Sequence, residues 1–327
     1  MKGKIRWGII GPGKIARKFA EDLKRIKEAE VSAVASRNRE RAVIFAEEFD
    51  VPHVFESYEA LFTSNTVDIV YIATPHTFHK ELSIQAMRAG KHVLCEKPLG
   101  ISPEEVEEIV EVAQQEGVFL MEGLWSRFNP TLKKVKAWIS GEKLGKVSYL
   151  HADFSFYALD KGMDSRLLNP GLASGSLLDV GIYPVFLSYF LLGVPEKIHA
   201  YANFLENGTE IQTSILFKYP NSLAILYSGL VGESKMEAEI SGSKGQILIH
   251  PRWHESQGFT LKLNDSIEEF QHPILGNGFV PEIEEVHNCL KNSKLNSELW
   301  SHTHSLDIAK LLGEIRSQIG ARFPFET

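Results

Sequence analysis

A glycine-rich turn near the N-terminus has the residue types and spacing of a dinucleotide-phosphate site. Gly11, Gly13 and Ala16 fit the pattern G-x-G-x-x-A, directly after an apolar strand pattern. Gly11 permits a tight turn, Gly13 lets a pyrophosphate approach the backbone without meeting a Cβ, and Ala16 lets the next helix pack closely on a sheet. The N–H groups at the start of that helix, at Lys14 and Ile15, would face the phosphates. The alternative is a glycine turn that binds nothing.

The end of the next strand pattern indicates which dinucleotide is bound. Sites that prefer NAD place Asp or Glu there for the ribose 2′-hydroxyl. This strand instead ends in Ser36 and Arg37, with Arg41 close behind. Ser36 and Arg37 could hold a 2′-phosphate through charge-assisted hydrogen bonds, whereas a carboxylate would repel it. We therefore expect NADP(H) rather than NAD(H). The alternative is that these arginines only form a solvated helix start.

Lys97, Asp179 and Tyr183 carry side chains suited to hydride transfer from a secondary alcohol. Such a reaction leaves an oxyanion that must lose a proton, so it needs a base and a cation near that oxygen. Lys97 can supply both the positive field and a proton. A tyrosine phenol, with an ordinary pKa of about 10, needs a nearby cation such as the Lys97 ammonium to act as a base. Asp179 lies four residues before Tyr183, so on a helix the two share one face. There Asp179 could orient Lys97 or a substrate hydroxyl; an exposed loop lysine and a helix N-cap aspartate are the alternatives.

Further polar and aromatic residues follow the strand patterns. In an open α/β sheet, ligands bind beyond the carboxyl ends of the strands, so residues at these ends are expected to face the nicotinamide portion. The expected cofactor contacts are Thr74, Pro75, His76, His79, Glu96, Lys97, Trp125 and Arg127. Trp125 and Arg127 could equally serve packing where the chain leaves the first domain. His76 and His79 are spaced like metal ligands, but no third ligand is evident, and we expect no metal site.

The elements that must position these residues follow two patterns, and the first covers about 120 residues. Short apolar runs, the candidate strands, lie at 5–10, 31–35, 67–73, 92–95 and 118–122. Amphipathic stretches, the candidate helices, lie at 14–26, 39–49, 79–89 and 103–115. Ser102 and Glu105 form a capping box at the start of the last helix, with Pro103 at its first position. Continuous apolar strands that alternate with helices predict a parallel sheet covered on both faces, an α/β Rossmann-type domain.

After Trp125 the apolar residues alternate with a period of two. This alternation is found at 198–204, 211–217 and 236–240, and helical patterns lie at 132–139, 281–291 and 301–319. The alternation predicts a large, mostly antiparallel open sheet with one buried face in an α+β domain. We place the dinucleotide domain at 1–123 and the substrate and oligomerisation domain at 124–327. Because the helices are too few to cover both faces, we expect a homodimer or homotetramer formed through the open face.

The composition excludes several classes of protein. The 35 basic and 42 acidic side chains give a net charge of −7, which argues against nucleic-acid binding. We find no apolar run approaching the roughly 20 residues that span a bilayer, and residues 1–7 read as a first strand rather than a signal peptide. Cys95 and Cys289 have no nearby partner in sequence, as is usual in a reduced chain. We expect a cytoplasmic protein without nucleic-acid or membrane partners.

The run AGKHVLCEKPL at residues 89–99 resembles the glucose–fructose oxidoreductase/inositol dehydrogenase/rhizopine catabolism (Gfo/Idh/MocA) family. The resemblance covers essentially the whole chain, and the order of the motifs is more specific than any one of them. The motifs are the glycine turn, Thr74-Pro75 with His79, Glu96-Lys97-Pro98 and GSLLDVGIY at 175–183.

Within that family the chain is most similar to the dimeric dihydrodiol dehydrogenase and NADP-linked xylose dehydrogenase branch. The similarity rests on EGLWSRFNP at 122–130 and on Asp179–Tyr183. Many members of the inositol dehydrogenase type carry His where this chain has Tyr183. The resemblance therefore implies that Tyr183, rather than an Asp–His relay, transfers the proton.

Together these features predict an NADP-dependent oxidoreductase that transfers a hydride between the nicotinamide and a sugar, polyol or cyclic trans-diol hydroxyl. Two alternatives stay open: a non-catalytic NADP-binding redox sensor, and an enzyme that uses bound NAD as a transient oxidant. The presence of Lys97 together with Asp179 and Tyr183 favours catalysis, because a sensor needs only the nucleotide site. Phe154 ends a strand pattern of the second domain and could either wall the substrate pocket or belong to the core.

Overall fold

The computed structural model describes residues 3–326, and the chain divides into two compact units. The first unit consists of the residues up to Trp125 together with 275–306, and the second consists of 126–274 with the residues from Asp307 onward. The sequence patterns gave no sign that 275–306 belongs with the first unit. The functional division at 123/124 stays a prediction.

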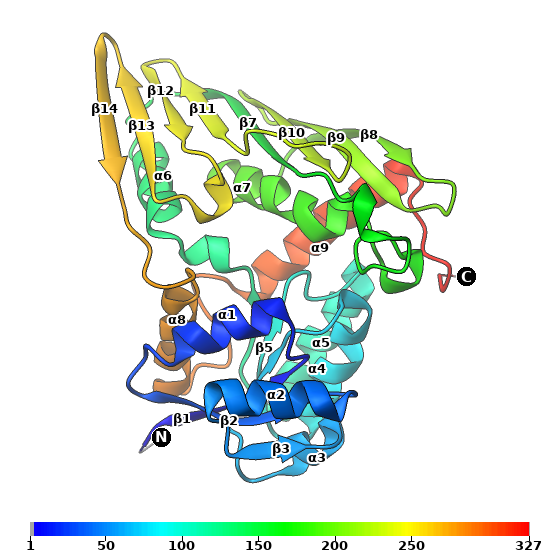
Figure 1. Cartoon of the computed structure of the whole chain (residues 1–327). Coiled ribbons are helices and arrows are strands. Elements are labelled where there is room, and N and C mark those ends of the chain that lie inside the picture. Colours follow the sequence, from blue (N-terminus) through cyan, green and yellow to red (C-terminus); the bar gives the residue numbers. More distant parts are fainter. Residues whose placement is uncertain (1–2, 327) are drawn as a thin grey trace. The chain divides into compact units, whose positions relative to one another are not determined.

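The first unit contains a six-stranded sheet in the order β3-β2-β1-β4-β5-β6 (Figure 1). Its strands are β1 (Ile5–Ile10), β2 (Ala29–Ala35), β3 (His53–Phe55), β4 (Ile69–Ile72), β5 (His92–Glu96) and β6 (Leu120–Gly123). Every neighbouring pair is parallel, which confirms the predicted parallel sheet. The order reverses between β1 and β4, and such a switch point is where open α/β sheets bind their ligands.

Among the described residues, six α-helices lie wholly in the first unit. They are α1 (Lys14–Leu23), α2 (Arg39–Phe49), α3 (Tyr58–Thr63), α4 (His79–Arg88), α5 (Pro103–Glu116) and α8 (Val280–Lys291). The predicted N-cap of α5 is confirmed, because the Ser102 side chain accepts a hydrogen bond from Glu105 N. At the other end, Gly117 terminates α5 with φ +64°. The elements β3 and α3 were not predicted, because three and six residues are too few to show a period.

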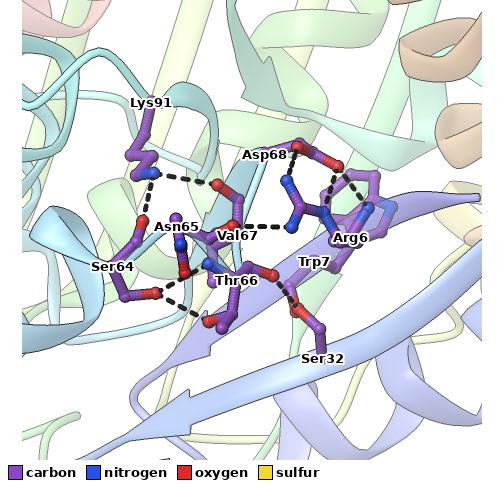
Figure 2. A network of polar contacts seen from close by, with 9 residues as sticks. All are labelled: Arg6, Trp7, Ser32, Ser64, Asn65, Thr66, Val67, Asp68 and Lys91. Atoms are coloured by element: carbon purple, nitrogen blue, oxygen red, sulfur yellow. Dashed lines mark hydrogen bonds and ion pairs between the residues drawn. The ribbon is translucent and has the colours of Figure 1, made fainter. Parts of the chain in front are cut away.

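A polar network ties together the amino-terminal side of this sheet (Figure 2). The Arg6 side chain donates to Asp68, and Lys91 Nζ donates to the carbonyl oxygens of Ser64, at 2.6 Å, and Val67, at 2.9 Å. Ser32 Oγ donates to the Thr66 carbonyl oxygen at 2.8 Å. These contacts hold the loop before β4 to the starts of β1 and β5. The glycine turn and Lys97 lie at the opposite edge of the sheet, where the strands end.

The second unit contains an eight-stranded sheet in the order β14-β13-β12-β11-β7-β10-β9-β8. Its strands are β7 (Val147–Ser155), β8 (Lys197–Phe204), β9 (Glu210–Lys218), β10 (Leu223–Gly229), β11 (Ala238–Gly242), β12 (Gly245–Ile249), β13 (Gly258–Leu263) and β14 (Ser266–Gln271). Only β7 and β10 pair in parallel, so the mostly antiparallel sheet is confirmed. The predicted strand start at Met236 is wrong: Met236 has φ +52°, and β11 begins at Ala238.

The helices α6 (Pro130–Ser140), α7 (Ile182–Leu192) and the later part of α9 (His302–Ile319) belong to the second unit. The alternation predicted from sequence is present in β9, where Ile215 and Phe217 are buried while Ser214 and Leu216 are exposed. On the exposed face of the sheet lie Tyr201, Leu216, Leu223 and Ile225. One face of the sheet is therefore core and the other is open, as expected.

One segment differs from the prediction that no apolar run is long enough to span a bilayer. Residues 170–192 are long and apolar enough to cross a bilayer, by length and composition only. In the folded chain 83% of that window is buried, and α7 alone contributes Phe186 and Leu187 to the core. The segment thus has the character of a buried core helix.

Candidate active site

The glycine turn between β1 and α1 forms a cradle that fits a dinucleotide phosphate. Gly11 has φ +75°, and an added Cβ would lie 2.7 Å from the Ala73 carbonyl oxygen, so only glycine fits. A Cβ on Gly13 would meet nothing closer than the Gly11 carbonyl oxygen at 3.9 Å, which leaves its outer side open. No side chain caps α1, so Lys14 and Ile15 begin a helix whose first N–H groups are available to an anion.

The end of β2 presents a hydroxyl and an arginine but no carboxylate. Ser36 is buried, and its Oγ accepts from Asn38 N at 3.2 Å. The Arg37 guanidinium lies over the Phe78 ring, 4.6 Å from the centroid. Arg41 is exposed in the first turn of α2. Stacking on an aromatic ring orients a guanidinium, so Phe78 restricts the orientation of the Arg37 side chain.

His79 connects the loops that follow β4 and β5. Its Nδ1 lies 2.7 Å from the Pro98 carbonyl oxygen, and its Nε2 lies 2.8 Å from the Thr74 carbonyl oxygen. Burial lowers the pKa of His79, although the two carbonyl groups oppose that shift. The imidazole thus bridges the Thr74 and Pro98 carbonyl groups and joins the two loops from inside the fold. His76 lies beside it, and residues 3–326 contain no cluster of side chains that could hold a metal.

Three buried carboxyl groups lie behind Lys97. Glu96 accepts from the Tyr71 hydroxyl, while Glu122 accepts from Leu99 N at 2.9 Å and Trp300 Nε1 at 3.1 Å. Burial raises the pKa of Glu96 and of Glu122, and the positive charge of Lys97 opposes both shifts. Glu96 is bonded to Tyr71 inside the unit, and its expected contact with the cofactor stays a prediction.

The third of these groups, Glu282, comes from α8. It is fully buried, and neither of its oxygens has a hydrogen-bond partner among the residues the structure describes. Burial raises its pKa well above the ordinary value, and the negative charges of Glu96 and Glu122 add to that shift. Glu282 therefore keeps its proton to higher pH than an ordinary glutamate.

The second unit brings Asp179 and Tyr183 onto one helical segment. A single π-helical turn, Leu177–Gly181, carries Asp179 and leads directly into α7, whose second residue is Tyr183. Asp179 accepts from Arg166 Nη1 at 2.6 Å. Asp179 lies inside the turn, so it is not the helix N-cap that the sequence analysis kept as an alternative.

Tyr183 is held in an aromatic cluster. Its ring centroid lies 5.5 Å from Phe154 and 5.3 Å from His254, and Phe154 stacks on His254 at 4.2 Å. Phe154 was a candidate from the sequence, whereas His254 and Arg166 were not predicted. No local pattern identifies these two residues, because their importance comes only from tertiary contacts to Tyr183 and Asp179.

Trp125 and Arg127 both have aromatic partners inside their own units. The Trp125 ring stacks on Phe279 with centroids 5.0 Å apart, and the Arg127 guanidinium lies 4.7 Å from the Phe190 centroid. Both contacts agree with a packing role. Contact of either residue with the cofactor stays a prediction.

Two family models match the chain over most of its length. The model described as "Oxidoreductase family, NAD-binding Rossmann fold" matches residues 5–124, and the model described as "GFO/IDH/MocA C-terminal domain" matches residues 132–248.

Among curated proteins, trans-1,2-dihydrobenzene-1,2-diol dehydrogenase of Mus musculus is 34% identical over 333 residues. The scyllo-inositol 2-dehydrogenase (NADP(+)) IolU of Bacillus subtilis is 32% identical over 326 residues. In each case the match covers 98% of both chains. Among solved structures, KijD10, a 3-ketoreductase from Actinomadura kijaniata in complex with NADP and TDP-benzene, is 27% identical with a TM-score of 0.89. That match covers 97% of this chain and 98% of the other.

Proposed function

This chain belongs to the Gfo/Idh/MocA oxidoreductase family, and we propose that it prefers NADP(H) over NAD(H) and acts on a vicinal trans-diol of a six-membered ring. It is an NAD(P)-dependent dehydrogenase that acts on CH–OH groups, as its relatives are. One observation carries the proposal: the open glycine cradle after β1 and Lys97 after β5 lie at the carboxyl edge of one parallel sheet.

The preference for NADP(H) is supported by the end of β2. Arg37, stacked on Phe78, offers a fixed cation for a 2′-phosphate, and the buried hydroxyl of Ser36 lies next to it in sequence. The acidic residue that would accept a ribose 2′-hydroxyl is missing from this strand end. One curated relative is named for NADP(+), and the solved 3-ketoreductase contains NADP.

The proposed chemistry divides between Lys97, Asp179 and Tyr183. When bound, the nicotinamide supplies the acceptor of the hydride that leaves the carbinol carbon. Tyr183, as the phenolate favoured by the Lys97 ammonium, takes the proton of the substrate hydroxyl on its Oη. The Lys97 ammonium stabilises the negative charge on the substrate oxygen. Asp179 accepts a hydrogen bond from a substrate hydroxyl while Arg166 keeps its carboxylate in place. In the reverse direction Tyr183 returns the proton.

The substrate class is supported by the relatives. The mouse relative is named for a trans-1,2-diol on a six-membered ring, and the Bacillus relative is named for scyllo-inositol, in which neighbouring hydroxyls are trans. A panel of trans-1,2-dihydrobenzene-1,2-diol, scyllo-inositol, myo-inositol and D-xylose tests the proposal through NADP⁺ reduction. We expect turnover with at least one trans-diol and slower turnover with NAD⁺. A wild type that binds NADPH but reduces NADP⁺ with no member of the panel would favour the redox-sensor alternative.

We also propose that the chain forms a homodimer or homotetramer through the open face of the second sheet. Tyr201 on this face is 81% exposed, and Leu216, Leu223 and Ile225 lie on the neighbouring strands. Exposed apolar groups on adjacent strands favour association. Sedimentation of the wild type should give an oligomeric mass, and Ile225→Glu should lower it; a monomeric wild type would contradict the proposal.

We propose a cytoplasmic location because neither cysteine needs an oxidising compartment. Cys95 and Cys289 are buried and free of disulfides. Burial raises the pKa of Cys289 to about 12, with Glu285 adding to the shift, so this thiol is inert at neutral pH. Reduced, unreactive cysteines are typical of cytosolic chains.

A further inference from the structure

We propose that Glu210 is a positioning residue for the reaction: its buried carboxylate holds the π-helical turn that carries Asp179 and leads into Tyr183. This inference rests on the proposed function, because it assigns a purpose to the geometry of those two side chains. Glu210 acts through the backbone and needs no contact with substrate.

The π-helical turn Leu177–Gly181 is the feature that needs support. Such turns are uncommon and usually occur as single turns at functional sites. Asp179 lies in the turn, and Tyr183 lies two residues beyond its last residue. A shift of the turn to regular α geometry would move Asp179 relative to Tyr183. Ser176, the residue before the turn, does not cap it with its side chain.

Glu210, the first residue of β9, provides that support from another element. Its Oε2 accepts from Leu177 N, the first N–H of the turn, at 2.8 Å. Its Oε1 accepts from Ser176 Oγ at 2.6 Å and from Thr213 Oγ1 at 2.7 Å. Ser176 Oγ also lies 2.9 Å from Ser228 Oγ on β10. The carboxylate thus joins the start of the turn to β9, and Ser176 extends the network to β10.

The backbone around the turn approaches these strands closely. An added Cβ on Gly175, which has φ +133°, would lie 3.0 Å from the Glu210 carbonyl oxygen and 3.1 Å from its Oε2. An added Cβ on Gly181 would lie 2.8 Å from Ser228 Oγ. Glycine before the turn and glycine at its end therefore allow the close approach that the hydrogen bonds of Glu210 require.

The ion pair between Arg166 and Asp179 holds the carboxylate, whereas Glu210 holds the backbone of the turn. Arg166 has a side chain that is 59% exposed and lies in the irregular segment between β7 and the turn. Solvent screens the arginine end of this pair, while the Asp179 side chain is only 8% exposed. Glu210 is only 5% exposed, and a hydrogen bond between buried partners fixes geometry more strongly. The strands, through Glu210, therefore set the position of the backbone that carries Asp179.

Kinetics of Glu210→Leu and Glu210→Gln test this role. We expect Glu210→Leu to lower kcat about 10- to 100-fold per NADPH-binding site while the KM for NADP⁺ changes less than about twofold, since small misplacements of catalytic groups are expensive. Glu210→Gln should retain kcat within about threefold, because the amide oxygen can accept from Leu177 N and the hydroxyl groups can rotate to accept from the amide.

Ser188→Ala is the matched control. Ser188 is buried on α7 and shares a 2.8 Å hydrogen bond with the Tyr219 hydroxyl, so the variant loses a buried hydrogen bond of the same helix away from the turn. We expect a lower melting temperature and an unchanged kcat. Ser176→Ala tests the same network if Glu210→Leu does not fold, with an expected loss of kcat of about threefold or more.

The double variant Glu210→Leu/Tyr183→Phe separates positioning from general damage. A positioning residue adds little once Tyr183 has lost its hydroxyl, whereas independent damage multiplies. An unchanged kcat in Glu210→Leu, or a full multiplicative loss in the double variant, would overturn the inference while leaving the proposed function intact. An inactive wild type would overturn both.

Discussion

Glu210 in the second unit and Glu282 in the first are both buried carboxyl groups next to proposed functional residues, yet their surroundings are opposite. Glu210 accepts from two hydroxyls and one backbone N–H, whereas Glu282 has no hydrogen-bond partner within residues 3–326. Burial raises the pKa of both groups, and the donors of Glu210 oppose the shift while Glu96 and Glu122 increase that of Glu282. A partnered carboxyl can organise the backbone, and an unpartnered one mainly lowers stability.

The same contrast extends to the three proposed catalytic side chains. In the first unit, Glu96 and Glu122 face the charge of Lys97, so the support there is electrostatic. In the second unit, Glu210 and the Phe154–His254 pair fix where Asp179 and Tyr183 lie, so the support is geometric. Substitutions in the two units should therefore fail in different ways.

Removal of the Lys97 ammonium should have the largest effect. We expect Lys97→Ala to lower kcat by about 10³-fold or more, because the developing negative charge loses its cation. NADPH affinity, measured by fluorescence titration, should change only a few fold. A near-normal kcat in Lys97→Ala would contradict the claim that the first unit contributes to catalysis through the charge of Lys97.

Loss of the Tyr183 hydroxyl comes next. Tyr183→Phe should lower kcat by about 10²-fold, within the range for proton transfer by a positioned group, with unchanged NADPH binding. The ring contacts with Phe154 and His254 remain, so its melting temperature should match the wild type. Near-normal turnover in this variant would assign the proton to another group and weaken the geometric half of the comparison.

The preference for NADP⁺ over NAD⁺ should change only with substitutions in the first unit. Arg37→Ala should lower the ratio of kcat/KM for NADP⁺ to that for NAD⁺ by about tenfold or more, since a charge-assisted hydrogen bond is lost. Phe78→Leu should lower it by a smaller factor of about three, in line with one cation–π contact. Steady-state kinetics with both cofactors measures this. A ratio that stays constant in Arg37→Ala would contradict the preference inferred from β2.

The smallest expected effect concerns stability and its pH dependence. Glu282 keeps its proton in the folded chain at pH values where an unfolded glutamate, with a pKa of about 4.3, has lost it. The folded state then binds more protons, so stability falls as pH rises, by about 1 kcal/mol per pH unit until the folded pKa is reached.

Glu282→Gln removes this dependence. We expect the variant to be about 1 kcal/mol or more stable than the wild type at neutral pH, with a flatter stability profile above pH 5 in denaturant unfolding. The matched change Glu210→Gln should bring no such gain in stability. The amide NH2 group cannot accept the hydrogen bonds that one carboxylate oxygen now receives from Ser176 and Thr213. Equal gains in both variants would erase the contrast between the two carboxyls.

Much of the fold was predictable because its signals are local. The glycine turn, the Ser102 cap and the period of two in β9 each depend on neighbouring residues, and the structure confirms them. The strand β3 and the helix α3 were not predictable, because segments of three and six residues carry too little periodicity.

The supports of the candidate site were beyond sequence reasoning for a different reason. Glu282 joins the first unit only because residues 275–306 pack there, 160 or so positions after β6. Glu210 is separated from Leu177 by 33 residues, and its role depends on the register of β9 and β10. Such long-range contacts leave no trace in spacing or composition.

Isotope transfer tests the central claim most directly. The substrate of the panel that the wild type oxidises fastest, deuterated at its carbinol carbons, is incubated with NADP⁺, and the reduced cofactor is analysed by mass spectrometry. We expect one deuterium in the NADPH formed by the wild type and no labelled NADPH from Lys97→Ala above the uncatalysed level. Unlabelled NADPH from the wild type, or equal labelling by both proteins, would contradict hydride transfer that depends on Lys97.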